Sequence, residues 1–294
     1  MRKILLFLIM FGVPSLLLSQ TAGGAIKRHS SNTSPKNNTV NKRVRTQSST
    51  SFNKYKTFEV KGVTFRMVYV EGGTYIMGGT LEQGNDAKND ENPIHEVTLS
   101  SFYIGETEVT QALWEVVMLE NPSDKKGYNL PVESVNWFDC HKFIDSLNSL
   151  TGQSFRFLTE SEWEYAARGG NKSRKYKYSG SNDVNKVAWH SENSGGKTHP
   201  VKTKEPNELG LFDMSGNVDE WCVDWYDDYP KELQTNPNGP QNGSFRVLRG
   251  GSFFFGPESC RISSRSNNNP GYYDFYPGLR LALSVPRVPR NGGL

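Results

Sequence analysis

The sequence predicts an α+β fold of strands and short helices, with little regular secondary structure. Residues 63–78 and 95–104 alternate between apolar and polar side chains, as half-buried strands do. Three later segments repeat apolar residues at helical spacing. Glycine (28 residues) and proline (15 residues) are frequent among the 294 residues and indicate many turns. This length allows one large domain or two small ones.

The first twenty residues have the pattern of a secretory signal peptide. Arg2 and Lys3 precede the apolar run 4–18, which small and polar residues follow. A membrane anchor is the alternative, but the run is short for one, and no later segment is long and apolar enough to span a bilayer. No cysteine directly follows the run, so the pattern does not indicate lipid attachment. We therefore expect an exported protein of the periplasm, the cell envelope or the extracellular space.

Residues 21–57 are expected to form a disordered basic tether, because they are rich in Ser, Thr, Asn and Lys and poor in large apolar side chains. Residues 1–58 hold 10 of the 34 Lys and Arg residues and no acid, which leaves 24 basic against 31 acidic residues. The domain is therefore acidic despite the net charge of +3, and nucleic acid is not an expected partner. The tether can rest on an anionic envelope surface or serve only as a solvated spacer.

Folded structure is expected to begin near Phe58 and to end near residue 290. Residues 63–70 and 74–78 are predicted to form a hairpin around the turn 71–73, and a further strand spans 95–104. The polar loop 81–92 carries acidic residues that lack the regular spacing of a calcium loop. We expect three of them, Asp86, Asp90 and Glu91, to be solvated.

Three helices are predicted after these strands. The first spans Gln111 to Met118, and the second is opened by the turn 131–134 and buries residues such as Trp137 and Phe143. The third begins with a capping box, in which Thr159 and Glu162 each accept a hydrogen bond from the other's backbone, and it ends at 169–170. Beyond residue 171 the sequence indicates only short strands and long turns.

The three cysteines allow one disulfide bond in an exported chain. Cys222 and Cys260 lie in turns rich in Trp or Arg, whereas Cys140 lies on the second predicted helix. We expect Cys222 to bond with Cys260, and Cys140 to be a small buried apolar residue. The other pairings remain alternatives.

The segment 209–226 concentrates polar chemistry beside large aromatic rings. Asp213, Asn217 and Glu220 stand close in sequence to Trp221 and Trp225. Because burying an unpaired carboxylate is costly, these groups need a shared partner. A hard cation or the buried backbone of another segment would provide it.

Blocks of residues along the chain resemble the sulfatase-modifying factor family, which contains the formylglycine-generating enzymes. They occur in the order MVYVEGGTYIMG (67–78), EVT (108–110), PVESVNW (131–137), FLTESEWEYAARG (157–169), LGLFDMSGNV (209–218), RGGS (249–252) and GLRL (278–281). The resemblance implies a single mixed α+β domain over residues 58–290, related to the C-type lectin fold.

The resemblance also implies a structural calcium ion. In the family, the matching segment binds calcium through two side chains and two main-chain carbonyls, which correspond here to Asp213, Gly216, Val218 and Glu220. All four positions can offer the oxygen atoms that calcium prefers. The alternative is a cation-free turn in which Asp213 and Glu220 accept backbone N–H groups.

The copper site of the enzymes is altered in this sequence. The enzymes oxidise a substrate cysteine with O₂ at a copper(I) ion held by two thiolates. The first thiolate is the third residue after Gly-Gly-Ser and corresponds to Phe255, and the second, five residues later, corresponds to Cys260. Counting backward from 264–266 gives Cys260 a different alignment, and Asp219 replaces an active-site Trp. Copper is therefore not an expected cofactor, and Cys260 is the one remaining catalytic candidate.

Other polar residues have simpler interpretations. Arg249 and Arg280 are expected to be buried and to pair with carboxylates such as Glu162 or Glu220. The five histidines show no spacing typical of a metal site. The run Phe253–Phe254–Phe255 is either core or the apolar floor of a peptide groove.

These observations favour a non-catalytic binding or scaffold module of the bacterial envelope, with a protein or an unfolded peptide as its partner. The alternative is a formylglycine-generating oxidase that converts the cysteine of a Cys-x-Pro-x-Arg peptide in a sulfatase. A third hypothesis is a different oxidase or transferase chemistry with non-haem iron. No paired set of histidines and carboxylates in the sequence supports that third hypothesis.

Overall fold

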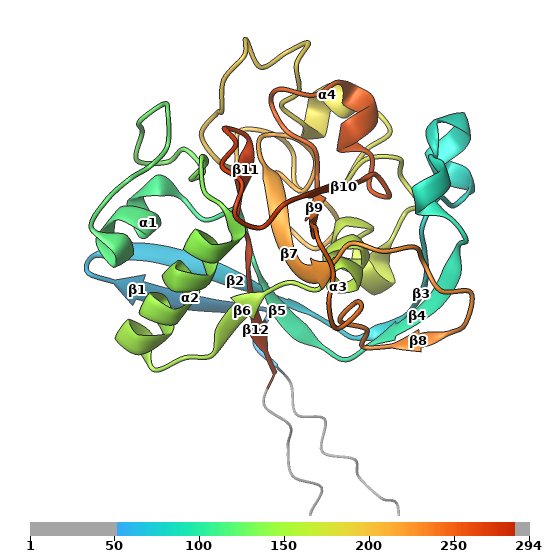
Figure 1. Ribbon diagram of the computed structural model, residues 1–294, viewed down its shortest axis with the longest axis horizontal. Helices are drawn as coiled ribbons and strands as arrows, with labels where there is room; N and C mark the ends of the chain where they lie inside the picture. The colour runs from blue at the N-terminus through green and yellow to red at the C-terminus, as the bar shows by residue number, and fades with distance from the viewer. Residues whose placement is uncertain (1–51, 286–294) are drawn as a thin grey trace, which may run out of the picture. The chain divides into compact units, whose positions relative to one another are not determined.

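A computed structural model describes residues 52–285 of the protein. The expected signal peptide (1–20), most of the expected tether (21–51) and the end of the expected domain (286–290) lie outside the described residues. The described part forms three β-sheets and four α-helices (Figure 1). Across residues 52–285, none of the helices combines the length and hydrophobicity that a membrane crossing requires.

The core is built on both faces of a five-stranded sheet with the order β1-β2-β5-β12-β6. Its strands are β1 (Tyr55–Val60), β2 (Val63–Val70), β5 (Phe102–Gly105), β12 (Leu281–Ser284) and β6 (Phe155–Phe157). Side chains alternate between the two faces of a strand. Accordingly, Leu281 and Leu283 of β12 enter one apolar cluster, whereas Ala282 enters the other. The last strand of the domain is thus buried on both sides.

Two helices, α1 (Gln111–Met118) and α2 (Trp137–Thr151), pack against each other (Figure 1), and α1 also contacts β1 and β2 whereas α2 contacts β6. The ring of Trp114 stacks on Phe143 with the ring centroids 4.7 Å apart. Both helices are confirmed, although the second begins at Trp137 rather than at the turn 131–134. Its N-cap is Asn136, whose side chain accepts a hydrogen bond from the amide of Asp139 at 2.9 Å.

The central helix α3 (Glu160–Ala167) packs against the second sheet, which has the order β10-β9-β7-β11. Its strands are β7 (Asp219–Trp225), β9 (Arg246–Arg249), β10 (Arg265–Asn268) and β11 (Pro277–Gly278). The predicted capping box of Thr159 and Glu162 is confirmed, and Gly169 follows the helix with a φ of 90°. The remaining α-helix, α4 (Val184–Val187), is a single turn.

A third sheet of three strands stands apart from the first two in the described fold. It contains β3 (Gly73–Met77), β4 (His95–Leu99) and β8 (Gln234–Thr235), with β4 in the middle. Short 3₁₀ helices occur at Leu81–Asp86, Asn89–Glu91, Gly170–Lys172 and Pro257–Cys260. The low content of regular structure is as the sequence predicts.

The hairpin expected from 63–70 and 74–78 is wrong in its pairing. Strand β2 pairs with β1 and β5, whereas β3 pairs with β4 in the third sheet. The strand expected over 95–104 is likewise interrupted, so that β4 and β5 belong to different sheets. Gly72 donates a backbone hydrogen bond to the hydroxyl of Ser101 at 2.9 Å, which joins the two points where the chain changes sheet. Folded structure begins at Tyr55 of β1, before the expected start at Phe58.

The loop 81–92 is not merely solvated. Glu91 is fully buried and forms an ion pair with Arg261, with 2.5 Å between Oε1 and Nη2. The carboxylate of Asp90 accepts a hydrogen bond from the hydroxyl of Tyr226 at 2.7 Å. Only Asp86 behaves as expected, because its side chain is 53% exposed. The loop therefore anchors the third sheet to the C-terminal part of the chain.

The disulfide bond expected between Cys222 and Cys260 is absent from the described structure. Cys140, Cys222 and Cys260 are all free and buried, and they belong to three different apolar clusters. The expectation that Cys140 is a small buried apolar residue is confirmed. Cys222 lies in strand β7 and Cys260 ends the 3₁₀ helix Pro257–Cys260, so neither cysteine stands in the turn expected from the sequence.

Candidate functional site

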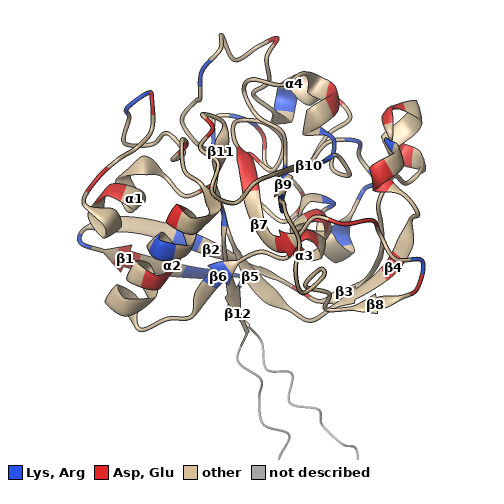
Figure 2. Ribbon diagram, viewed as in Figure 1, with Lys and Arg blue, Asp and Glu red and all other residues tan. Residues whose placement is uncertain are grey.

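Buried arginines fix the segment 209–226 to the rest of the domain. Both carboxylate oxygens of Glu220 accept hydrogen bonds from Arg280, the shortest at 2.7 Å, and Oε2 also accepts one from the indole of Trp163 at 2.8 Å. The expected pair of Arg280 and Glu220 is thereby confirmed. In Figure 2 the acidic residues of α3 and β7 appear as red segments near the centre of the ribbon.

Arg249 is buried and paired with carboxylates, as expected, but its partners are neither of the two examples, Glu162 and Glu220. Its guanidinium lies 2.5 Å from Oε2 of Glu164 and 3.5 Å from Oε1 of Glu160. Glu162 instead pairs with Arg156 at 2.7 Å. The reason is helical geometry, because Glu160 and Glu164 lie four residues apart on the buried face of α3.

The turn 213–218 contains three of the four predicted calcium residues, and all four, Glu220 included, are buried. Asp213 and Asn217 have positive φ angles of 56° and 63°, and Gly216 has a φ of 79°. A side chain at Gly216 would collide with the main-chain carbonyl of Trp189, so this position requires glycine. The side-chain amide of Asn217 donates a hydrogen bond to Glu108 at 2.9 Å. Glu108 is thus part of this site, although the sequence analysis did not include it.

Both positive and negative groups surround the buried carboxylate of Asp213. Burial is the main cause that raises the pKa of Asp213 to about 6; the backbone hydrogen bond from Lys202 and the positive charge of Arg280 oppose the shift, and the negative charge of Glu220 contributes to it. Burial also raises the pKa of Glu108 well above its usual value, and the charges of Asp213 and Glu220 add to that effect. The buried Oδ1 of Asp213 has no hydrogen-bond partner in the described structure. Asp213 therefore fits the role of a cation ligand.

Glu220 fits that role less well, because Arg280 and Trp163 already use both of its oxygens. Within residues 52–285, no three His, Cys, Asp or Glu side chains come together in a way that could hold a metal ion. Any calcium ligation would therefore depend on main-chain carbonyls such as those of Gly216 and Val218. Calcium at this turn stays a prediction.

A pocket of about 220 Å³ is lined by Phe255, one of the two positions that correspond to the copper ligands of the enzymes. We call it the Asp219 pocket; it is lined by Lys88, Asp219, Leu248, Arg249, Gly250, Gly251, Phe255, Ser259, Ser264, Arg265 and Ser266. Oδ1 of Asp219 accepts a hydrogen bond from the amide of Gly251 at 3.0 Å. Oδ2 of Asp219 is buried and has no partner in the described structure. Burial raises the pKa of Asp219 to about 7.

Cys260, the catalytic candidate of the oxidase hypothesis, does not line this pocket. Its side chain is fully buried among Tyr178, Val187 and Ala188. Burial raises the pKa of the Cys260 thiol, followed by the negative charge of Asp219. Reactive thiolates have a lowered pKa and are accessible, so this environment is typical of a structural cysteine.

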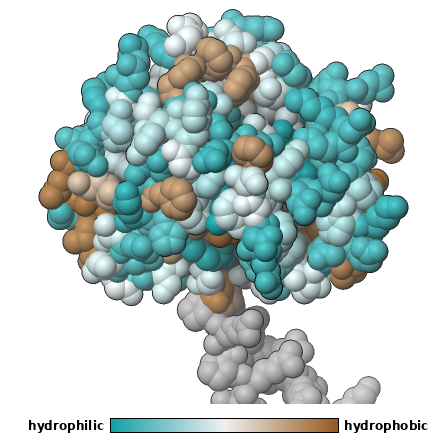
Figure 3. All heavy atoms as spheres, viewed as in Figure 1, coloured by the Kyte–Doolittle hydropathy of each residue, from teal (hydrophilic) through white to brown (hydrophobic). Residues whose placement is uncertain are grey.

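An aromatic cluster adjoins the Asp219 pocket through Phe255. It consists of Phe253, Phe254, Phe255, Phe275 and Tyr276, which come from two loops and contact one another through their rings. Phe254 and Phe275 are 52% and 42% exposed, whereas Phe253 is buried. Figure 3 shows separate hydrophobic patches on an otherwise hydrophilic face of the protein. Exposed aromatic groups that gather in this way are typical of an interaction surface.

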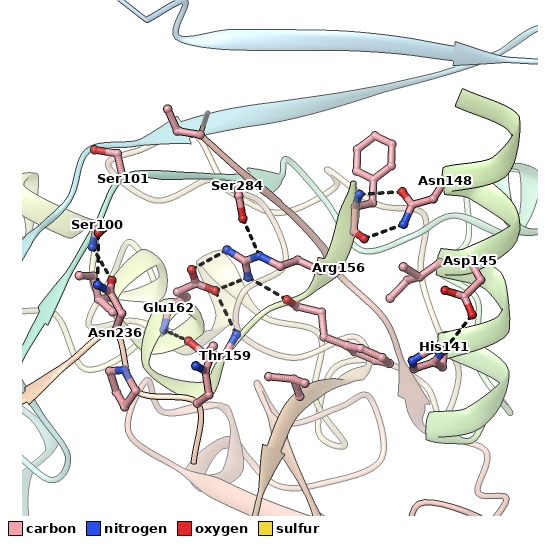
Figure 4. A pocket seen from close by; sticks show the side chains of 18 of the residues that line it. Ser100, Ser101, His141, Asp145, Asn148, Arg156, Thr159, Glu162, Asn236 and Ser284 are labelled. Carbon is pink, nitrogen blue, oxygen red and sulfur yellow. Dashed lines mark hydrogen bonds and ion pairs between the residues drawn. The ribbon is translucent and has the colours of Figure 1, made fainter. Parts of the chain in front are cut away.

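A second and larger pocket of about 600 Å³ lies between α2, β6 and the end of β12. Figure 4 shows that its polar side chains satisfy one another: Arg156 bonds with Glu162 and Ser284, and His141 bonds with Asp145. Within the described residues, none of its buried side-chain polar atoms lacks a partner. The Asp219 pocket, with its unpartnered oxygen, is therefore the stronger candidate.

Sequence reasoning noted Asp219 only as the replacement of a Trp, and it did not include Phe275 or Tyr276 at all. Their contact with the run 253–255 depends on two loops that meet only in the folded chain. The signal that could have found them is the aromatic and acidic string YYDFY at 272–276. Such a string in a turn region is hard to explain by core packing alone.

Comparison with known proteins identifies a family model and several related proteins that match the described domain. Residues 51–285 match the family model described as a sulfatase-modifying factor enzyme 1-like domain. The chain is 33% identical over 249 residues to the chaperone protein LppX of Paenibacillus barcinonensis, covering 68% of this chain and 82% of LppX. It is 29% identical over 284 residues to the formylglycine-generating enzyme of Streptomyces coelicolor, covering 73% of this chain and 88% of the enzyme.

A solved structure agrees with these sequence matches. Treponema denticola variable protein 1 superposes with a TM-score of 0.72 at 34% identity, covering 80% of this chain and 100% of that chain. By contrast, the chain spans 38% of the length of the serine/threonine-protein kinase pkn1 of Chlamydia caviae, to which it is 31% identical over 249 residues, or 74% of this chain.

Proposed function

Because this chain belongs to the family of sulfatase-modifying factor enzyme 1-like domains, we propose that it is a non-catalytic binding or scaffold module of the bacterial envelope. The domain is single and has the C-type-lectin-like fold. In this proposal it recognises a protein or an unfolded peptide through the aromatic cluster and the adjoining Asp219 pocket. The observation that carries the proposal is the exposure of Phe254 and Phe275 at that place.

The chemistry of the pocket supports binding rather than copper oxidation. Phe255 stands where the enzymes are expected to have their first copper thiolate, and its ring packs against Tyr276 with the centroids 4.8 Å apart. A phenyl ring offers no lone pair to a metal ion, whereas copper(I) prefers thiolates. The name of the relative LppX, a chaperone protein, is consistent with a role in binding another protein.

The proposed location outside the cytoplasm is supported by the sequence alone. Residues 1–20 have the pattern of a signal peptide, and the basic residues of 21–51 can contact an anionic envelope surface. In the proposal, this segment keeps the binding domain close to the envelope.

The test is capture of partners from the native envelope by chemical crosslinking to the full-length protein. We expect the double variant Phe254→Ser, Phe275→Ser to lose a specific crosslinked product that the wild-type protein forms. The matched control is Tyr128→Ser, because Tyr128 is 65% exposed but lies outside the cluster. A crosslinked product that persists in the double variant would contradict the proposal.

A second candidate function is a formylglycine-generating oxidase, which the 29% identity to the Streptomyces coelicolor enzyme favours. It would use Cys260 as its remaining thiol. The test is incubation with copper(I) and a Cys-x-Pro-x-Arg peptide, followed by mass spectrometry for the aldehyde product. Multiple turnovers that Cys260→Ser abolishes would replace the binding proposal with this one.

A further inference from the structure

The Asp219 pocket contains a hydrogen-bond acceptor that the protein does not satisfy. Asp219 is 2% exposed, and its Oδ1 is fixed by the amide of Gly251 at 3.0 Å. Its Oδ2 has no donor within the described residues. A buried carboxylate oxygen without a donor costs free energy, so a ligand that brings a donor to Oδ2 would be favoured.

The nearby charge that no buried arginine neutralises is negative. It belongs to Asp274, in the loop that also carries Phe275 and Tyr276, whereas Glu220 is paired with Arg280. The backbone amide of Asp219 donates to the carbonyl of Tyr276 at 3.0 Å, so this loop lies directly beside the carboxylate. A donor that also carries a positive charge is therefore favoured over a neutral donor.

The basic residues of the pocket do not reverse this preference. Arg265 forms two hydrogen bonds with Glu160, and Arg249 bonds with Glu164. Their charges are paired with carboxylates inside the fold, although Nε of Arg249 has no hydrogen-bond partner within the described residues. Lys88 is exposed, so its side chain can turn toward solvent. An anionic ligand would approach the carboxylate of Asp219, which disfavours it.

The aromatic rings next to the pocket add to the attraction for a cation. Aromatic faces attract ammonium and guanidinium groups. The protein already uses this combination internally, since the guanidinium of Arg265 lies 3.9 Å from the ring centroid of Tyr229 while it is paired with Glu160. Phe255 and Tyr276 can provide the same aromatic surroundings beside Asp219.

We propose that the Asp219 pocket receives a basic side chain, arginine or lysine, of the bound protein or peptide, with Asp219 as the residue that determines this specificity. The inference rests on the proposed binding function and names the chemistry of its partner. In the bound state the basic group donates to Oδ2, and the hydroxyls of Ser259, Ser264 and Ser266 are available for its other N–H groups. The volume of about 220 Å³ suits one side chain rather than a folded ligand.

The test uses two probes of nearly the same shape, Nα-acetyl-arginine amide and Nα-acetyl-citrulline amide, which differ in charge. Titration of the ¹⁵N-labelled full-length protein is followed by NMR at the amide of Gly251, which bonds Asp219 directly. We expect saturable binding of the arginine probe and binding at least about tenfold weaker for the citrulline probe, as is typical when a charged hydrogen bond is lost. A third probe, Nα-acetyl-lysine amide, should bind as the arginine probe does.

The variant Asp219→Asn should reduce binding of the arginine probe by a similar factor, because asparagine keeps an acceptor for Gly251 but loses the charge. Asp228→Asn is the control, since Asp228 is exposed and lines a different pocket. Equal binding of the arginine and citrulline probes to wild-type protein would overturn the inference, even if the Asp219 variant did not fold. If neither probe binds but crosslinking still depends on Phe254 and Phe275, the specificity inference alone fails.

Discussion

At the scale of single residues, the buried pair of Glu91 and Arg261 shows how the domain is held together. Both side chains are fully buried, and both oxygens of Glu91 accept from the guanidinium, at 2.5 and 2.8 Å. The hydroxyl of Ser263 also donates to Glu91 at 2.5 Å. Removing one member would leave the other charge buried without a partner.

We expect Glu91→Gln to lower the free energy of unfolding by about 3–5 kcal/mol, the usual effect of breaking a buried ion pair. The measurement is equilibrium unfolding in urea. The matched control is Asp86→Asn, which removes a carboxylate from the same loop at the exposed pair with Lys177. Equal stability of Glu91→Gln and the control would show that Arg261 finds another partner.

Asp213 allows a direct test of the proposed calcium ion. Its unpartnered Oδ1 and the neighbouring carboxylates Glu108 and Glu220 favour a bound cation. We expect chelation with EDTA to lower the melting temperature of the protein and added calcium to restore it, because a ligand that binds only the folded state stabilises it. Asp213→Ala should abolish the response. A wild-type melting temperature that neither EDTA nor calcium changes would contradict the proposed calcium ion.

At the scale of secondary-structure elements, Asp224 of β7 holds the start of α3. Its Oδ2 accepts a hydrogen bond from the amide of Glu160 at 2.8 Å. Burial raises the pKa of Asp224 to about 8, and the negative charge of Glu160 contributes to the shift. The folded state therefore keeps a proton on Asp224 at pH values where the unfolded chain has lost it.

This difference predicts a pH dependence of stability. The contribution of Asp224 is fully present below about pH 4 and is lost as the pH rises to about 8, with a slope of up to about 1.4 kcal/mol per pH unit. Asp224→Asn should flatten the stability curve in this window, because asparagine has no proton to lose. Urea unfolding of both proteins from pH 4 to pH 8 measures the slopes, and parallel curves would contradict the assignment.

The helices were predictable from the sequence because their signals are local. The capping box of Thr159 and Glu162 and the apolar spacing in 137–147 are properties of neighbouring residues. The strand pairing was not predictable, because β3 and β2 are adjacent in sequence but belong to different sheets. The glycines at 72–73 are compatible with either a hairpin turn or a change of sheet.

The candidate site was predictable only in part for the same reason. The positions of Asp213, Glu220 and Arg280 follow from blocks of sequence, and the pair of Arg280 and Glu220 is confirmed. The burial of Glu91 and the contact of Phe255 with Tyr276 depend on segments far apart in the chain. No spacing rule within one segment can reveal such contacts.

At the scale of the whole molecule, the three cysteines lie in three separate apolar clusters. We expect alkylation of the native protein without reductant to add no adduct, because all three thiols are buried. Alkylation after denaturation, still without reductant, should add three adducts to the intact mass. A single adduct under those conditions would indicate one disulfide bond and contradict the three free thiols, and peptide mapping would then show which two cysteines are bonded.

The position of β12 has a consequence for how the chain acquires its structure. This strand is the last one described, yet it lies between β5 and β6 and contributes to both apolar clusters. During synthesis, the edges of β5 and β6 that pair with β12 stay unpaired until residues 281–284 have left the ribosome. A nascent chain in that condition is prone to aggregate and open to chaperones. A premature stop a few codons before Leu281 should therefore yield an insoluble product rather than a slightly shorter working protein.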